Sequence, residues 1–412
     1  MHGDGTRPAI TTPEMARARL IDLTRSLRRA GRIATGIDRV EHAYLGRFLS
    51  DTEPVFGIVR TPFGYLLLDR AGLEAVRDRL DGLVPWGGVS LMSRLAPGRD
   101  EIALRAESDA RQLAIARVSR RGLRRMLRAH LDGAVDYFNV GHSDLTDRVL
   151  DAVDGIGGAI HVMIHDVIPL EHPEYQRKGA ARRFEKKLRR VGARAHRIIY
   201  NSADTRSRAE RHLESWGRVP DGIVAHLGTI TLQADATALP VGLPPRGPYF
   251  VTVGTIEPRK NHAFLLDLWD DWGQDAPPLL ICGSRGWNNE EVFARLDALP
   301  PDGAVRELPG LDDAGLAALI EKSSGVLFPS VAEGFGLPPV EALSLGARVL
   351  CNDLNVFREI LGKNPVYVDV SDPKMWKNTL MRWANEPPDA PEEHRYSGST
   401  WDDHFKTVLS LM

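Results

Sequence analysis

Residues 325–341 read GVLFPSVAEGFGLPPVE. The first four are of the apolar type found in a buried strand, and Pro338 and Pro339 favour the first turn of a helix, where proline has no amide hydrogen to leave unbonded. Gly334 and Gly336 lie between these two parts and let the backbone approach a ligand closely. This order predicts a strand, a loop and a helix.

The same alternation continues on both sides of this stretch. Further apolar runs of strand length lie at 249–253, 279–282, 348–351 and 366–368. Longer stretches separate them, such as 312–323, whose 3.6-residue apolar period is typical of a helix that packs on a sheet. We therefore expect parallel strands joined by crossover helices, which is a doubly wound fold of the α/β class.

The length of the chain, 412 residues, exceeds that of a single hydrophobic core, so two domains are expected. The first half repeats the alternation less regularly, with candidate strands at 20–23, 55–59, 137–140, 160–164 and 197–200. Proline and glycine crowd 239–248, where neither a helix nor a central strand can continue. We predict a first domain at 1–240 with a flexible tail at 1–14, a linker at 241–248, a second domain at 249–390, and a C-terminal helix within 391–412 that crosses back to the first domain.

The composition is that of a soluble globular protein. Hydrophobic residues make up 43% of the chain, charged residues 26%, and the net charge is -2, which argues against disordered and fibrous classes. Cys282 and Cys351 each lie in an apolar run and are expected to be buried thiols. We find neither a secretory leader nor an apolar run of about 20 residues, so a cytoplasmic enzyme is expected.

Parallel sheets bind ligands at the carboxyl ends of their strands, which directs attention to the loops that follow the apolar runs. After 325–328, the amides of Phe335, Gly336 and Leu337 precede a helix and form an anion site, while Glu333 and Glu341 place a carboxylate on either side. Another loop, 283–287, follows the apolar run at 279–282. It is interpreted as a packing loop that could also lie beside a nucleotide base.

After 249–253, Gly254 permits a turn, and Arg259 and Lys260 add two adjacent positive charges. A diphosphate fits such a pair of cations. The two loops together therefore predict a site for a phosphorylated ligand.

These residues resemble the donor site of the family 4 retaining glycosyltransferases, which have two Rossmann-like domains facing across a cleft in the GT-B arrangement. The resemblance rests on Glu333 and Glu341 separated by seven residues, together with Gly254 and the Arg259-Lys260-Asn261 sequence, and it covers 249–369. It is thinner in the first half, where Gly36 in 35–40 resembles the family's glycine loop and His165-Asp166 resembles its histidine loop.

The resemblance implies a role for each of these residues. Arg259 and Lys260 would neutralise the leaving diphosphate, with help from the amides of 335–337, and Glu341 would bind the ribose. Glu333 would hold hydroxyls of the donor sugar. The nucleotide would lie against the glycines of three loops, which are Gly36, Gly254, Gly334 and Gly336.

The roles of the histidines and of Asp166 stay open. His165 would lie near the reacting carbon, or it is a histidine satisfied beside the sheet. Asp166 is an acceptor-side base or a helix cap. His142, which also follows a candidate strand, faces the acceptor or is structural.

Two departures from the family pattern concern the phosphate site. Thr255 stands where many relatives have arginine, and the glycine loop has a single glycine. The sequence contains no Asp-x-Asp triplet to hold a metal-bound diphosphate. We therefore expect neither a metal nor another cofactor to be required.

We expect a retaining hexosyltransferase that moves a sugar from a nucleotide-diphosphate sugar to a lipid-linked or polysaccharide acceptor in surface glycan assembly. GDP-mannose is the first expected donor and a UDP-sugar the second. A sugar-nucleotide epimerase on the same fold is the alternative enzyme. Nucleic-acid binding by arginine-rich helices is an alternative of another class, which the near-neutral charge disfavours.

Two basic amphipathic stretches lie in the first half, at 111–130 and 177–197. Such helices can lie against anionic lipid headgroups, which would place the enzyme peripherally on the inner face of a membrane. The other interpretation is a solvated basic face above an ordinary core stripe.

Overall fold

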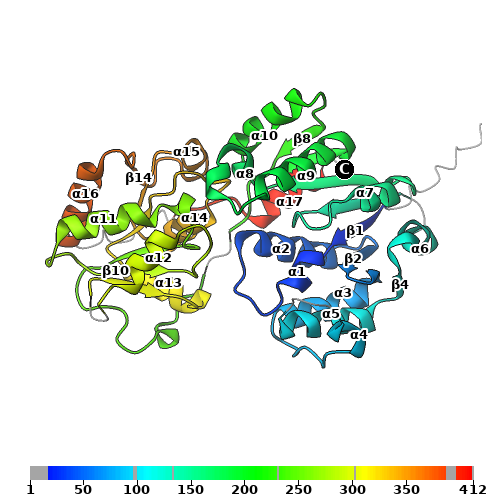
Figure 1. The fold of residues 1–412 in the computed structure, drawn as a ribbon, viewed down its shortest axis with the longest axis horizontal. Coiled ribbons are helices and arrows are strands. Elements are labelled where there is room, and N and C mark those ends of the chain that lie inside the picture. Colours follow the sequence, from blue (N-terminus) through cyan, green and yellow to red (C-terminus); the bar gives the residue numbers. More distant parts are fainter. Residues whose placement is uncertain are drawn as a thin grey trace, which may run out of the picture. The chain divides into compact units, whose positions relative to one another are not determined.

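The computed structural model describes residues 17–95, 100–131, 134–229, 232–300, 303–386 and 396–410 (Figure 1). These form two compact units. One takes the chain up to Gly31 together with Glu41–His161, and the other takes Arg32–Val40 and the chain from Val162 onward. The predicted tail at 1–14 lies outside the described residues, and the predicted domain boundaries stay a prediction.

The first unit contains a mixed sheet in which β1 pairs in parallel with β2 and β5, whereas β3 pairs antiparallel with β2 and β4. In order across the sheet, its strands are β4 (Ala116–Val118), β3 (Gly64–Leu68), β2 (Val55–Thr61), β1 (Ala18–Asp22) and β5 (Val135–Asn139). Its helices are α1 (Thr24–Arg28), α3 (Arg70–Leu80), α4 (Leu91–Arg94), α5 (Glu101–Leu113), α6 (Leu123–His130) and α7 (Asp147–Asp154). The antiparallel strands β3 and β4 were not predicted.

The predicted basic helix at 111–130 is wrong, because this stretch is not one helix. It contains the end of α5, the strand β4, a 3-10 turn at Arg120–Gly122 and α6. Arg111 is buried and donates to Glu107 one turn earlier on α5, at 2.8 Å. The apolar residues of 111–130 keep a helical spacing even though β4 interrupts the stretch, and this spacing led to the wrong prediction.

The second unit begins with Arg32–Val40, where α2 (Gly36–Ser50) starts. It continues with the last three residues of β6 (Ala159–Ile164), followed in the sheet order by β7 (Arg197–Tyr200) and β8 (Asp221–Val224). The helices that accompany these strands are α8 (Ile168–Glu171), α9 (Ala180–Arg194) and α10 (Ala203–Ser215).

The six-stranded sheet of the second unit is entirely parallel. Its order is β11 (Val305–Leu308), β10 (Leu279–Cys282), β9 (Phe250–Val253), β12 (Gly325–Phe328), β13 (Val349–Cys351) and β14 (Val366–Tyr367). Its helices are α11 (His262–Trp272), α12 (Glu290–Asp297), α13 (Asp313–Glu321), α14 (Leu337–Ser344), α15 (Asn355–Leu361) and α16 (Pro373–Asn385). All five strands expected here are present, and β11 is additional.

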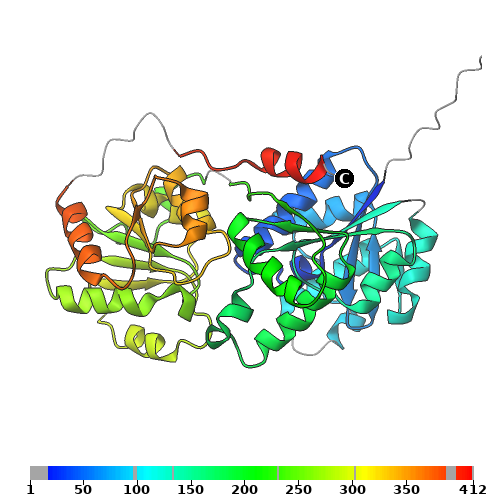
Figure 2. The same ribbon diagram turned by 90° about the horizontal axis from the view of Figure 1, so that it is seen from above.

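Helices cover this sheet on both faces (Figure 2). Apolar residues of α11, α12 and α16, among them Trp269, Leu296 and Trp376, form one core with alternate strand residues. The strand order reverses between β9 and β12, because the chain proceeds outward from β9 through β10 to β11 and then returns to β12 on the other side. Such a switch point leaves a crevice at the carboxyl ends of the two strands, where doubly wound folds bind ligands.

The last helix, α17 (Trp401–Leu409), is drawn in red in Figure 2. Its His404 ring lies 3.2 Å from the carbonyl oxygen of Ala225 and 3.0 Å from that of His226. Ala225, His226 and His404 all belong to the second unit, and the predicted crossing of this helix to the first domain stays a prediction. In the part of the chain that the structure describes, we found no helix with the length and apolarity needed to cross a membrane.

Candidate functional site

The carboxylate of Glu333 is the centre of the site at the switch point. Glu333 lies in the loop between β12 and α14 and is buried, with 6% of its surface exposed. Lys260 Nζ donates to its Oε1 at 2.6 Å, and Arg259 Nη1 donates to its Oε2 at 2.7 Å. Both cations belong to the 3-10 turn Pro258–Lys260 that follows β9. The structure therefore brings together three of the predicted site residues from two loops.

The charges around Glu333 keep it ionised. Burial on its own would raise the pKa of Glu333, but the charges of Arg259 and Lys260 outweigh burial and lower that pKa to about 2. Arg259 also pairs with the buried Glu257 at 2.7 Å, and burial raises the pKa of that second carboxyl. An ammonium has three donors and each carboxylate oxygen two lone pairs, so Lys260 and Glu333 can bind a ligand while they remain paired.

Gly254 provides the turn that was expected of it. Its φ is +140°, and a Cβ there would lie 3.3 Å from Lys260 Cε. On the other side, a Cβ on Gly283 would lie 2.0 Å from the Gly254 carbonyl oxygen. The loop 283–287 therefore packs directly on Gly254, which supports its interpretation as a packing loop.

Gly334 is required by a contact within the protein. A Cβ on Gly334 would lie 2.1 Å from the carbonyl oxygen of His165 and 2.9 Å from Asp166 Cβ. The sequence interpretation was that this glycine lets the backbone approach a ligand. The structure gives a different reason for it, because the loop 333–336 lies against the backbone of the histidine loop.

The histidine loop follows β6. His165 is buried, with 6% of its surface exposed. Asp166 Oδ1 accepts the amide of Ile168 at 3.0 Å, which favours the capping interpretation of this aspartate, since Ile168 begins α8. Burial raises the pKa of Asp166, against the opposing charge of Arg259.

The helix that carries Glu341 begins as the prolines predict. α14 starts at Leu337, and Pro338 and Pro339 occupy its first turn. Gly336 precedes it with φ +94°, and a Cβ there would lie 2.7 Å from the Phe357 ring. Glycine is therefore required both by the backbone angle and by the packing.

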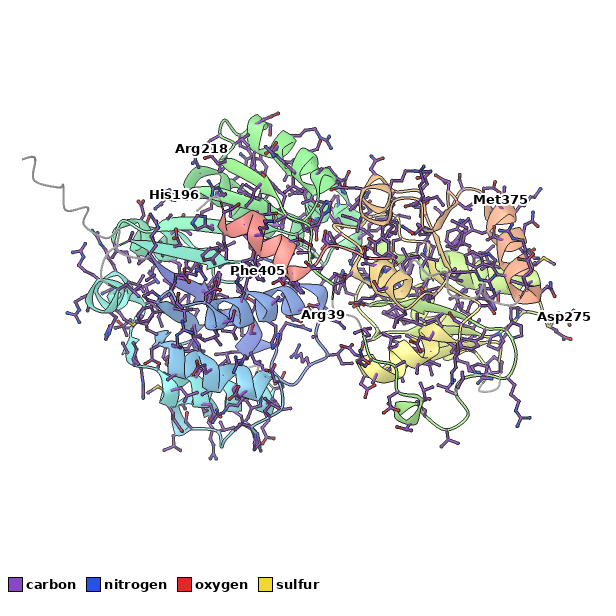
Figure 3. All side chains as sticks on the ribbon, turned by 180° about the vertical axis from the view of Figure 1, so that it is seen from behind. Arg39, His196, Arg218, Asp275, Met375 and Phe405 are labelled. Carbon is purple, nitrogen blue, oxygen red and sulfur yellow. The ribbon has the colours of Figure 1, made fainter. Side chains whose placement is uncertain are left out.

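Glu341 has a partner that the sequence did not reveal. Arg39 Nη1 donates to Glu341 Oε1 at 2.7 Å, and Arg39 Nη2 donates to Asp313 Oδ1 at 2.7 Å. Burial raises the pKa of Glu341, and the charge of Arg39 opposes that rise. Figure 3 labels Arg39, which lies three residues after Gly36. The only indication in the sequence that Arg39 belongs to the site was its position in the segment 35–40, which resembles the glycine loop.

The glycine loop itself lies beside α14. A Cβ on Gly36 would be 3.2 Å from Leu337 Cδ1. Asp38 accepts from both the amide and the hydroxyl of Thr35, at 2.8 and 2.7 Å, and so shapes the start of α2. His142 belongs to the other unit, where it has φ 56°, and its acceptor role stays a prediction.

The ion pairs of Glu333 should make stability depend on pH. Its pKa falls from 4.5 to about 2, so the pairing contributes about 3 kcal/mol to the free energy of unfolding at neutral pH. A lowered carboxyl pKa stabilises fully above about pH 4.5, and the contribution is lost as pH falls toward 2. Glu333→Gln should therefore destabilise the chain at pH 7, and its difference from wild type should shrink between pH 4.5 and 3 in urea denaturation.

Glu307→Gln is the matched control. Glu307 pairs with Arg285 at 2.7 Å, but this pair is partly exposed and should contribute less than about 1 kcal/mol. A Glu333→Gln difference that stays constant from pH 7 to pH 3 would contradict the assignment.

This chain is similar in sequence to known transferases. The family model described as glycosyl transferases group 1 matches residues 238–400. The serotype-specific mannosyltransferase WbdA of Escherichia coli is 29% identical over 283 residues, which cover 63% of this chain and 34% of WbdA. The O-antigen chain mannosyltransferase B of Escherichia coli is 30% identical over 216 residues, covering 50% of this chain and 56% of that protein. The chain thus spans about a third to a half of the length of these relatives.

Solved structures share the fold. Sucrose-phosphate synthase from Thermosynechococcus elongatus matches with a TM-score of 0.61 over 96% of this chain and 98% of its own, at 13% identity. At that identity the likeness shows the fold alone, and it confirms the predicted α/β class. The resemblance to glycosyltransferases is likewise confirmed, because the model of the glycosyl transferases group 1 matches residues 238–400, which carry Arg259, Lys260, Glu333 and Glu341.

Proposed function

We propose that this protein is a retaining glycosyltransferase that moves a hexose from a nucleotide-diphosphate sugar to a lipid-linked or polysaccharide acceptor in surface glycan assembly. The observation that carries the proposal is the buried Glu333 carboxylate paired with Arg259 and Lys260 at the switch point of the matched segment. Two relatives are named as mannosyltransferases, one of them acting on O-antigen chains. GDP-mannose is therefore the first donor to test and a UDP-sugar the second.

The cations and the helix start serve the leaving group in this proposal. Arg259 and Lys260 neutralise the charge that grows on the departing diphosphate, and the amides of 335–337 add dipoles at the start of α14. Electrostatic stabilisation of this kind, set up in advance in a buried site, is usually the largest catalytic contribution.

The carboxylates position the donor. Glu333 is ionised and accepts hydrogen bonds from sugar hydroxyls, while Glu341 accepts those of the ribose. His165 lies beside the same loop, against Gly334. No protein nucleophile is assigned, so the acceptor attacks from the face that the diphosphate leaves.

The bonds balance as follows in such a front-face transfer. The bond between the anomeric carbon and the phosphate oxygen breaks, and a bond from that carbon to the acceptor oxygen forms. The acceptor proton moves to an oxygen of the departing diphosphate. The protein then contributes orientation and charge, which together can lower the barrier by several kcal/mol.

Neither alternative gains support from the described residues. No contact favours an epimerase over a transferase, and no recognised nucleic-acid module appears in the described fold. Release of a free epimer from the donor without an acceptor would identify the first alternative.

A panel of nucleotide sugars tests the donor. A ligand that binds only the folded chain stabilises it by about 2.7 kcal/mol at a hundred times its Kd, so the correct donor should raise Tm by several degrees. We expect GDP-mannose to give the largest rise, UDP-sugars a smaller one, and the selected donor to support transfer to a glycan acceptor.

Two lysine variants, measured with the same panel of nucleotide sugars, test whether Lys260 binds the donor. Lys260→Ala should lose most of the donor-induced rise, because it removes one of the two phosphate cations. Lys377→Ala removes a lysine that pairs with Asp271 at 2.6 Å on the surface, and it should keep the rise. A full rise in Lys260→Ala would exclude the assigned role, and no rise with any nucleotide sugar would exclude the donor class.

We also propose that no metal is required, because Arg259 and Lys260 supply the positive charge that a divalent cation supplies in other transferases. Transfer from the selected donor should proceed at an unchanged rate in excess EDTA. A rate that falls in EDTA and returns on addition of magnesium would contradict this proposal.

The basic face of α9 supports a peripheral membrane role, which we propose as part of the same function. Leu188 and Val191 of this helix are buried, whereas Arg182, Arg183 and Lys186 are exposed. Arg189 lies over the Trp216 ring at 4.2 Å, so part of the basic surface is fixed by packing.

Vesicle sedimentation tests the α9 surface. Each cation near an anionic membrane contributes about 1 kcal/mol, so the triple change Arg182→Gln, Arg183→Gln and Lys186→Gln should weaken binding to anionic vesicles by roughly a hundredfold. The control is the double change Lys363→Gln and Lys374→Gln, which removes two lysines that lie in the same unit but outside α9. Equal binding to zwitterionic vesicles, or no effect of the triple change, would exclude the membrane role.

A further inference from the structure

The N-terminal end of α10, with the two residues that precede it, holds the two loops of the donor site together by their backbone carbonyls. Thr205 Oγ1 donates to the Gly334 carbonyl at 3.0 Å, and Ser202 Oγ lies 3.1 Å from the same oxygen. Asn201 Nδ2 donates to the His165 carbonyl at 2.9 Å. The carbonyl groups of both loops are therefore held by three side chains at the N-terminal end of α10, which are Asn201, the N-cap Ser202 and Thr205.

These contacts are sealed from water. Asn201, Ser202 and Thr205 each expose 2% or less of their surface. Ser202 Oγ also accepts the Thr205 amide at 3.0 Å, so it caps α10 and fixes the threonine that reaches the loop. A buried carbonyl that loses its donor bears the cost of its desolvation, which makes these bonds more consequential than surface ones.

The start of α10 is itself anchored to a third element. Glu359 on α15 accepts the amides of Ala203 at 2.6 Å and Asp204 at 3.0 Å. The same carboxylate lies 2.8 Å from His226 Nε2. A carboxylate at a helix N-terminus is stabilised by the unpaired amides there, so α10 has a fixed position relative to α15.

We propose that Thr205 and Ser202 are positioning residues for donor binding, which hold the Gly334 carbonyl so that Glu333 and the amides of 335–337 face the nucleotide sugar. The inference rests on the proposed function and extends it to residues outside the donor loop. Neither hydroxyl touches the donor in this proposal. Each acts through the loop, and its loss leaves a loop that must be ordered when the donor binds.

Thr205→Val is the test variant, because valine keeps the shape of threonine and its amide bond to Ser202 while removing one of the two hydroxyl donors to the Gly334 carbonyl. We expect the KM for GDP-mannose to rise about tenfold and the KM for the acceptor to stay unchanged. Thr205→Ser, which restores a hydroxyl, should recover most of the donor KM.

Tyr249→Phe is the matched control. It also removes one buried hydroxyl bond to a backbone carbonyl, from Tyr249 OH to Leu319 at 2.7 Å, but at the opposite end of β9 from the site. We expect a lower Tm with an unchanged donor KM. A donor KM that rises equally in both variants, or that does not rise in Thr205→Val, overturns the proposal.

Amide hydrogen exchange separates this inference from the proposed function. Exchange at 333–337 should be about tenfold faster in Thr205→Val than in wild type and unchanged in Tyr249→Phe, and this measurement needs no activity. If the wild-type chain transfers nothing from any nucleotide sugar, the proposed function fails while the exchange still tests the positioning. Unchanged exchange at 333–337 in Thr205→Val overturns the positioning role itself.

Discussion

The buried carboxylate of Glu333 is the constraint on which the site depends. Removing a carboxylate from water is costly unless cations and hydrogen bonds replace the water, and removal of one partner from such a pair typically costs about 3–5 kcal/mol. Arg259 and Lys260 meet this requirement from the neighbouring loop. The loop after β9 and the loop after β12 must therefore stay together, and the reversal of strand order between these strands makes that possible.

The same carboxylate also limits how the cations can act. Arg259 is shared between Glu257 and Glu333, so its guanidinium is held in one place by two anions. A group that is already oriented loses little freedom when it binds a phosphate. The two carboxylates weaken the attraction between Arg259 and an anionic ligand, but they also fix the position of the guanidinium.

Much of the second unit's parallel sheet could be predicted, because its central strands are continuous apolar runs that have no other stable position. The strand β11 was missed since its sequence, Val305–Leu308, has two charged residues at its centre and is only partly buried. In the first unit, β3 and β4 form antiparallel pairs, which a search for alternating strands and helices does not detect. The stretch 111–130 was misread because its apolar residues keep a helical spacing although the strand β4 interrupts it.

In the site, contacts that follow from the order of the strands could be predicted, whereas contacts between residues far apart in the sequence could not. Glu333, Arg259 and Lys260 follow strands whose ends meet, so their proximity follows from the fold class. Arg39 and Glu341 are 302 positions apart, and no local pattern connects them. Gly334 was predicted to let the backbone approach a ligand. In the structure, the carbonyl oxygen of His165 is the neighbour that leaves no space for a side chain at this position.

That last contact has a mechanical consequence. Two loops that meet through backbone atoms have no side chain between them to change rotamer and absorb a displacement. One of the loops at His165 and Gly334 can therefore move toward the other only if that other loop moves too. Variation in the shape of this site would have to arise from residues on either side of the contact, because a side chain at position 334 has no room there.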